Sequence, residues 1–244
     1  MYDVIIIGAG LSGIATLYNL SKLVSERARV LIIDSRADIG GIAYNTASSA
    51  QILNVPASKM SIDCDLADDF VTFLRSTHPE FSPESFIPRS VYREYLDHHC
   101  DKISGQSNIE LTFIGGDVSN IKIEENLFSV SLGEDHSHLG RFVVLALGNS
   151  LKDRGFNGAL LNPWSNEDLE RALNSPAIAV LGSSLTAIDV ILDMESRGYK
   201  GRYNIYSRRG LFPLAHRAVI NSNFEEHVSS ITSAPTLLKK LRSF

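Results

Sequence analysis

The first part of the chain alternates between apolar runs and an amphipathic stretch. Residues 4–7 are four consecutive β-branched side chains, typical of a strand buried on both faces of a parallel sheet. Residues 11–24 repeat apolar side chains near helical spacing, and residues 28–34 form a second apolar run that ends in an acid. This pattern predicts a strand, a helix and a second strand, the βαβ unit of an α/β fold.

The pattern changes in the middle of the chain. Residues 66–78 and 89–103 are amphipathic helical patterns separated by prolines, which predicts a helical insertion over about 54–105. From 109 to 147 apolar and polar side chains alternate, as in half-buried antiparallel strands, before residues 142–147 become continuously apolar. We expect a β-meander over about 109–147 that ends in a buried strand.

A second βαβ pattern begins after Pro176. Residues 177–182 predict a strand, residues 183–198 a helix that stops at Gly198, and residues 202–207 another strand. Because the unit occurs twice, we expect two nucleotide-binding domains, over residues 1–150 and 151–220, and a tail over residues 221–244.

Composition and charge exclude several kinds of partner. The 244 residues are 44% hydrophobic, enough to bury a core, and the net charge of -5 offers no attraction to nucleic acid or to an acidic membrane. The sequence has no apolar run near the roughly 18 residues of a membrane helix, and its first apolar run is too short for a signal sequence. We therefore expect a soluble, cytoplasmic protein without nucleic-acid or membrane partners.

The cysteines and histidines predict no chemistry. Cys64 and Cys100 form no CxxC pair, which argues against a redox-active disulfide and against a zinc site, so no metal is predicted. Neighbouring helix positions point in different directions, so we expect His98 and His99 on a solvated helix surface. His136 and His138 are expected at the tip of a hairpin.

The first glycine-rich stretch, GAGLSG over residues 8–13, follows the first strand directly. Gly8 permits a tight turn, Gly10 lets the backbone approach a pyrophosphate, and Gly13 lets the helix pack closely on the strand. The phosphates would rest on the helix N-terminus, and Asp34, about 20 residues further on, can accept the ribose hydroxyls. The stretch predicts dinucleotide binding; the alternative is a turn from sheet to helix that binds nothing.

The second such stretch is altered at one position. Gly182 is its first glycine and Ala187 the permitted small third residue, but Ser184 stands at the second position. A serine Cβ intrudes toward the pyrophosphate, although its hydroxyl, like that of Ser183 or Thr186, can donate to a phosphate oxygen. We expect weakened binding rather than none.

The end of the second unit indicates which nucleotide it takes. Ser207, Arg208 and Arg209 stand where an NAD-binding fold carries its ribose-binding acid. No carboxylate is present to hold a 2′-hydroxyl, whereas two guanidinium groups can hold a 2′-phosphate. The motif therefore predicts NADPH; the alternative is a solvated or inter-domain arginine patch.

These motifs together resemble the FAD-NAD(P)-binding family of flavoproteins with two dinucleotide-binding domains, relatives of a bacterial FAD-dependent urate hydroxylase and of flavin N-hydroxylating monooxygenases. The resemblance is carried by GAGLSG, GGIAYNT, ILNVPASKMS, FIPRSVYREYL, FVVLALGN, SLTAIDVILDM and YSRRGLFPLAH. It implies a Rossmann-like FAD-binding domain with a helical insertion and a β-meander, and a second Rossmann-like NAD(P)-binding domain. It also implies a monooxygenase-related oxidoreductase that uses FAD and NADPH on a small-molecule substrate.

The resemblance also implies individual contacts. Asn54 would neighbour the flavin, Val118 would touch the adenine through its backbone, and Gly148 would lie where the chain leaves the FAD domain; a loop cap at Asn54 and an ordinary strand residue at Val118 are the alternatives. The other expected FAD contacts are Gly8, Ala9, Gly10, Leu11, Ser12, Gly13, Asp34, Ser35 and Gly41. The expected NADPH contacts are Gly182, Ser183, Ser184, Ser207, Arg208 and Arg209. No catalytic residue is predicted, because the flavin supplies the chemistry.

The sequence departs from the family after YSRRGLFPLAHR, where a returning strand with a Gly-Asp motif is expected. An incomplete sheet would leave an unpaired strand edge, which favours a homo-oligomer or a completing partner chain. Two functions therefore stay open: an FAD- and NADPH-dependent oxidoreductase, and a nucleotide-binding or regulatory remnant without catalysis. A dehydrogenase that uses only the first site is weaker, because it lacks a candidate base.

Overall fold

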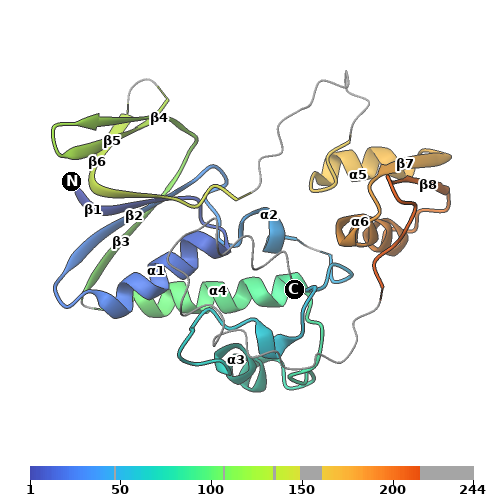
Figure 1. Ribbon diagram of the computed structural model, residues 1–244, viewed down its shortest axis with the longest axis horizontal. Coiled ribbons are helices and arrows are strands. Elements are labelled where there is room, and N and C mark those ends of the chain that lie inside the picture. Colours follow the sequence, from blue (N-terminus) through green and yellow to red (C-terminus); the bar gives the residue numbers. More distant parts are fainter. Residues whose placement is uncertain (47, 107, 134–135, 149–160, 215–244) are drawn as a thin grey trace. The chain divides into compact units, whose positions relative to one another are not determined.

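The computed structural model describes residues 1–46, 48–106, 108–133, 136–148 and 161–214. The chain divides into two units, Met1–Leu211 and Phe212–Phe244. Within the first unit the strands form two separate sheets, and we describe the region around each sheet by itself (Figure 1).

The first region contains a sheet of six strands among the described residues, in the order β3-β2-β1-β6-β5-β4. The strands are β1 (Tyr2–Ile7), β2 (Ala28–Asp34), β3 (Ile109–Gly115), β4 (Val118–Glu124), β5 (Leu127–Leu132) and β6 (His136–Leu145). β1 runs parallel to both β2 and β6, so it is central in the sheet. Its isoleucines are buried because each face of the sheet is covered, which explains the continuous apolar run in the sequence.

The meander is shorter than the sequence pattern predicts. β3 pairs parallel with β2, so the antiparallel part consists of β4, β5 and β6 and begins at Val118. β3 shows the same alternation of burial as an antiparallel strand because it lies at the edge of the sheet. His136 and His138 lie on β6, paired with Leu132 and Val130, instead of at a hairpin tip.

β6 changes partner along its length. Residues 136–140 pair antiparallel with β5, and residues 140–145 pair parallel with β1. On the side away from β1, residues 141–145 pair with no other strand in the described part of the chain. Phe142 is 62% exposed and Leu145 59% exposed, although the apolar run predicts a buried strand. The difference arises because burial of a strand needs a neighbour on both sides as well as a covered face.

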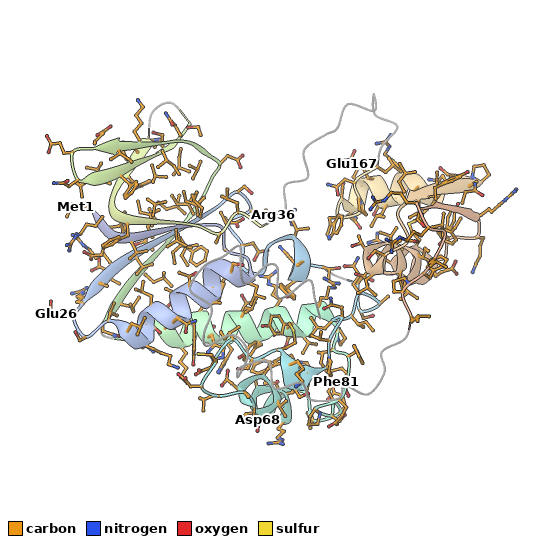
Figure 2. The ribbon with its side chains drawn as sticks, in the orientation of Figure 1. Met1, Glu26, Arg36, Asp68, Phe81 and Glu167 are labelled. Carbon is orange, nitrogen blue, oxygen red and sulfur yellow. The ribbon has the colours of Figure 1, made fainter. Side chains whose placement is uncertain are left out.

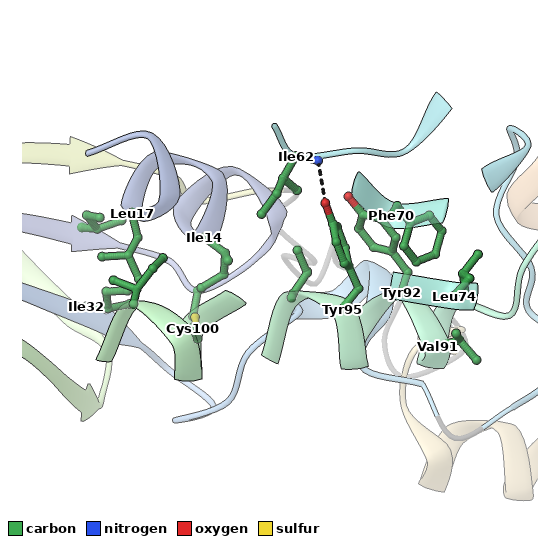
Figure 3. Close-up of a cluster of buried hydrophobic side chains, with 14 of the residues drawn as sticks. Ile14, Leu17, Ile32, Ile62, Phe70, Leu74, Val91, Tyr92, Tyr95 and Cys100 are labelled. Atoms are coloured by element: carbon green, nitrogen blue, oxygen red, sulfur yellow. Dashed lines mark hydrogen bonds between the residues drawn. The ribbon is translucent and has the colours of Figure 1, made fainter. Parts of the chain in front are cut away.

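The helices of this region all lie on one side of the sheet (Figure 1). They are α1 (Leu11–Leu23), α2 (Gly41–Tyr44), the short 3-10 helix η1 (Ala57–Lys59), α3 (Asp69–Thr77) and α4 (Arg89–Ser104). α1 and α4 lie side by side below β1, β2 and β3 in Figure 1, and β4 and β5 of the same sheet lie above these strands. Ile14 and Leu17 of α1 meet Ile32 of β2 and Cys100 of α4 in the larger apolar core (Figure 3). The helical insertion expected from the sequence is therefore formed by α3 and α4.

A buried polar link runs through this insertion. The Tyr95 hydroxyl donates to the Asp69 carboxylate at 2.6 Å and accepts the Ile62 N–H at 3.1 Å (Figure 3). His99 Nε2 lies 2.8 Å from the same carboxylate. His99 is only 3% exposed, so the expected solvated position is wrong for this residue, whereas His98 beside it is exposed. α4 is packed on two sides, by α1 and α3, and burial lowers the pKa of His99.

The second region repeats the βαβ pattern on a smaller scale. It contains α5 (Asn166–Leu173), β7 (Ala177–Leu181), α6 (Leu185–Ser196) and β8 (Arg202–Tyr206). β7 and β8 are parallel, as the sequence predicts for a strand, helix and strand. Leu169, Ala172, Met194 and Tyr199 form its core. In the described residues of both regions, no helix has the length and apolar character needed to cross a membrane.

Candidate dinucleotide-binding sites

The first glycine turn joins β1 to α1, and two of its glycines are required by the fold itself. Gly8 has a φ of 106°, and its N–H donates to the Ile33 carbonyl at 2.7 Å. A Cβ on Gly8 would lie 2.2 Å from the Ala146 oxygen, and a Cβ on Gly13 would lie 1.9 Å from the Gly8 oxygen. Both positions therefore admit no side chain.

Gly10 differs from these two glycines. Its φ of -70° and ψ of -177° are open to any residue, and a Cβ there would meet only the Gly41 Cα, at 3.9 Å. Neither its backbone conformation nor its packing explains why this position is glycine. Gly10 is the N-cap of α1, where the first N–H groups have no partner within the helix. The open space in front of its backbone suits the close approach of an anionic group.

A second glycine pair lies directly against the first turn. The Gly40 N–H donates to the Ala9 carbonyl at 3.0 Å, and Gly10 and Gly40 form a parallel bridge. Gly40 has a φ of 99° and Gly41 a φ of 57°, and a Cβ on Gly41 would lie 3.1 Å from the Gly10 Cα. The backbone of this glycine pair therefore lies close to Gly10.

Asp34 is the last residue of β2, and its carboxylate is hydrogen-bonded to the first glycine turn. One carboxylate oxygen accepts the Ala9 N–H at 2.8 Å, and the other accepts the Arg36 N–H at 3.0 Å. Arg36, labelled in Figure 2, marks the turn that follows β2. Each carboxylate oxygen has a further lone pair, so the group can hold the turn and still accept a hydroxyl.

These elements surround a hollow at the carboxyl ends of β1, β2 and β6. The predicted residues that line it are Gly8, Gly10, Leu11, Ser12, Asp34, Ser35, Gly41 and Gly148. Ala9 and Gly13 are buried beneath it. Asn54 and Val118 do not line it: Asn54 is exposed ahead of η1, and Val118 packs against the second core of the sheet. The roles expected for these two residues stay predictions.

Further residues of the hollow are not among the contacts expected from the sequence. Arg36, Gly40, Ile42, Ala43, Tyr44, Arg89, Ala146 and Leu147 also line it. Arg89 begins α4, and its guanidinium donates to the carbonyls of Ile52 at 3.1 Å and Ala43 at 3.4 Å. Burial raises the pKa of Tyr44, so its hydroxyl stays protonated at neutral pH. The motif FIPRSVYREYL contains Arg89, but its spacing does not reveal which residues it faces.

The second glycine turn, between β7 and α6, has nearly the same backbone as the first. Gly182 has a φ of 117°, and its N–H donates to the Tyr206 carbonyl at 2.8 Å. Ser184 is the N-cap of α6, with φ -84° and ψ -175° and no side-chain cap bond. Ala187, at the third position, is buried. The serine therefore leaves the turn intact and places an exposed Cβ where Gly10 has none.

The residues after β8 take the place of Asp34. Leu181 pairs with Tyr206 as Ile7 pairs with Ile33, so Ser207 corresponds to Asp34. The Ser207 hydroxyl oxygen accepts the Gly210 N–H at 3.0 Å, and Arg208 and Arg209 are exposed beside it. The predicted arginine pair therefore follows the strand at the end where a ribose would bind.

The Ser183 hydroxyl is not free to point toward a bound phosphate, in contrast to the expectation from the sequence. Its hydroxyl donates to the Leu211 carbonyl at 2.5 Å. A hydroxyl has one hydrogen, so in this conformation it has none to give to a phosphate. The hydroxyl holds the segment after β8 against the glycine turn.

One group of three side chains with metal-binding atoms occurs among the described residues, at Asp63, Cys64 and Asp65. The Lys22 ammonium contacts the Asp63 carboxylate at 2.9 Å and the Asp65 carboxylate at 2.7 Å. Burial of Asp63 opposes its ionisation, but hydrogen bonds from Tyr18 and Lys22 hold its pKa at about 2. The group is therefore arranged as a hydrogen-bonded ion pair.

Fold and site together define a dinucleotide-binding protein of the Rossmann-like class with two glycine turns. Residues 5–150 match the model of the FAD-NAD(P)-binding family, and the chain belongs to this family. No curated protein matches its sequence.

Three solved structures share the fold over most of this chain. OTEMO in complex with FAD and NADP is 17% identical, with a TM-score of 0.56 over 85% of this chain and 39% of that one. Cyclohexanone monooxygenase from Rhodococcus sp. Phi1, a mutant bound to NADP+, is 19% identical, with a TM-score of 0.53 over 85% and 38%. Bacillithiol disulfide reductase from Staphylococcus aureus is 21% identical, with a TM-score of 0.50 over 82% and 61%. The predicted fold class is confirmed, and the chain spans about two fifths of the length of these monooxygenases.

Proposed function

We propose that the chain binds FAD at the first glycine turn and NADPH at the second, and takes part in a monooxygenase-related oxidoreduction of a small molecule. Gly10 carries the FAD part of the proposal. Neither backbone conformation nor packing requires a glycine at this position. The N–H of Gly10 lies at the start of α1, and the space in front of it is part of the hollow. A pyrophosphate needs this combination of close backbone approach and free N–H donors.

The residues of the hollow fit the parts of FAD. The N–H groups at the start of α1 would hold the pyrophosphate, and Asp34 would accept the ribose hydroxyls. When bound, FAD would supply the redox chemistry, and NADPH would be its source of reducing equivalents. The chain's own contribution is to bind and orient the two nucleotides.

The test is a titration of the purified chain with FAD, followed by flavin fluorescence and absorbance. The wild type should take up FAD, and Gly10→Ala should weaken binding about tenfold or more, because a methyl group would occupy the space of the pyrophosphate. Gly105→Ala is the matched control, since Gly105 at the end of α4 has a φ of -81° and room for a Cβ. No flavin uptake by the wild type would refute the FAD proposal.

The choice of NADPH is supported by Arg208, Arg209 and the serine in place of the acid. Exchanging both arginines for Ala should weaken NADPH about tenfold to a hundredfold, because charge-assisted hydrogen bonds to the 2′-phosphate are lost, and should hardly affect NADH. Arg202→Ala, an exposed arginine at the start of β8, is the control. An equal loss for the two cofactors would show that the pair does not read the 2′-phosphate.

The alternative function, a nucleotide-binding or regulatory remnant, is supported by the exposed edge of β6 at Phe142 and Leu145. A completing chain or a second copy would cover this edge. Oxidation of NADPH by the isolated chain with added FAD would exclude the remnant, and light scattering would reveal a homo-oligomer. We also propose a cytoplasmic location, which the free thiols of Cys64 and Cys100 favour.

A further inference from the structure

The segment over residues 38–45, here called the Gly40 turn, forms one wall of the hollow. Gly40, Gly41, Ile42 and Tyr44 face the hollow from it. Its only regular structure is α2, which is four residues long and ends with a bond from the Asn45 N–H to the Gly41 carbonyl at 3.1 Å. A single helical turn is not stable by itself, so contacts from elsewhere must hold this wall in place.

Arg93 of α4 supplies such contacts at both ends of the turn. Its Nη2 forms an ion pair with one Asp38 oxygen, and its Nη1 donates to the other at 3.1 Å. The same Nη1 donates to the Asn45 side-chain oxygen at 2.9 Å, and the Asn45 amide donates to Asp38 at 2.6 Å. Asp38 precedes the glycine pair and Asn45 follows it, so the guanidinium joins the two ends of the Gly40 turn.

The aliphatic part of Arg93 fixes the middle of the turn. A Cβ on Gly40 would lie 3.4 Å from the Arg93 Cγ, so the side chain packs against the glycine backbone. The Gly40 N–H also bonds to the Ala9 carbonyl of the first glycine turn at 3.0 Å. The Gly40 turn is thereby held between Arg93 and the first glycine turn. Arg93 itself does not line the hollow.

We propose that Arg93 is a positioning residue for the dinucleotide site: by joining Asp38 to Asn45 it holds Gly41 against Gly10 at the place where the pyrophosphate would bind. The inference rests on the proposed FAD site for its ligand. Lysine cannot replace Arg93 in this role, because an ammonium lacks the planar fork that reaches both Asp38 oxygens and Asn45 together.

The experiment compares Arg93→Lys and Arg93→Ala with the wild type in FAD titration. Both variants should bind FAD at least about tenfold more weakly, and millimolar methylguanidinium should restore part of the affinity of Arg93→Ala and none of that of Arg93→Lys. Arg75→Lys and Arg75→Ala, on the exposed face of α3, are the controls. If Arg93→Lys bound FAD with wild-type affinity, the proposal would be wrong, because a positive charge on an aliphatic side chain would then be enough to position the Gly40 turn.

A second readout does not depend on FAD. Hydrogen exchange at the Gly40 and Asn45 amides should become faster in Arg93→Lys, while the amides of α4 stay protected. Unchanged exchange at these two amides would overturn the inference. If Arg93→Ala does not fold, Asn45→Ala tests the same link, because it removes one end and leaves the Arg93–Asp38 ion pair. Failure of the wild type to bind FAD would refute the proposed function, whereas faster exchange would still support the Arg93 link.

Discussion

The two glycine turns have the same backbone and different surroundings. Gly8 and Gly182 have φ values of 106° and 117°, and each donates its N–H to the last residues of the neighbouring strand. A Cβ on Gly8 would collide with Ala146, whereas a Cβ on Gly182 would meet no atom of the described residues within 4 Å. The βαβ unit thus fixes the conformation of the turn, and segments distant in sequence build the walls around it. At the second turn, the hydrogen bond from Ser183 to the Leu211 carbonyl joins the turn to the segment after β8.

The same contrast holds at the ends of the second strands. Asp34 accepts two backbone N–H groups and holds the first turn to its sheet, while Ser207 accepts only the Gly210 N–H within its own loop. In the second region, the hydrogen bond from the Ser183 hydroxyl to the Leu211 carbonyl connects the turn to the segment after the strand. The first turn is therefore held by hydrogen bonds to a carboxylate, and the second by a hydrogen bond from a neutral hydroxyl.

The largest expected effect concerns the first glycine of each turn. Gly8→Ala should lower the free energy of unfolding by about 4 kcal/mol or more, because left-handed strain adds to a clash with a backbone carbonyl. Gly182→Ala should cost only about 1–2 kcal/mol, the strain alone. Urea unfolding followed by circular dichroism measures both, and the fluorescence of Trp164, the single tryptophan, reports on the second region. Equal losses would mean that the surroundings of the turns do not differ as described.

An intermediate effect is expected from exchanging the residues at the strand ends. Asp34→Ser should destabilise the first region by about 1–3 kcal/mol, because the buried Ala9 N–H loses its acceptor, and should weaken FAD binding. Ser207→Asp should hardly change stability and should shift the preference from NADPH toward NADH, since a carboxylate repels the 2′-phosphate and accepts the 2′-hydroxyl. Melting curves and cofactor titrations measure both effects. If Ser207→Asp kept the wild-type preference for NADPH over NADH, then Ser207 would not have the role in cofactor binding that Asp34 has at the end of the first strand pair.

The smallest effect is expected at Ser183. Ser183→Ala should cost about 1 kcal/mol or less, because it removes one exposed neutral hydrogen bond to Leu211. NADPH affinity should stay within about twofold of the wild type if the hydroxyl is bound to the chain and not to the phosphate. A tenfold loss measured by NADPH titration would instead support the role expected from the sequence. Ser196→Ala, whose hydroxyl bonds within α6, is a control.

The features that could be predicted from the sequence are those that depend on residues close to one another in the chain. The spacing of Gly8, Gly10 and Gly13 reveals the turn because conformation and close packing over six residues depend on those residues alone. The burial of His99 and the exposure of Phe142 depend on which elements pack against α4 and β6, and short periodic patterns do not encode these neighbours. Arg93 was equally hidden, because Asp38 and Asn45 belong to a turn far from it in sequence.

The packing of Gly8 against Ala146 has a consequence for how the protein folds while it is being synthesised. β1 is made first, yet its neighbour β6 is among the last strands of the sheet, with Tyr2 paired to Gly140 and Ile7 to Leu145. Such non-local pairing is slow to form, and the apolar β1 stays open on one edge until the later strand has left the ribosome. The nucleotide turn at the N-terminus is therefore completed only when Ala146 has been added to the chain, and until then one edge of β1 is open to pairing with other strands.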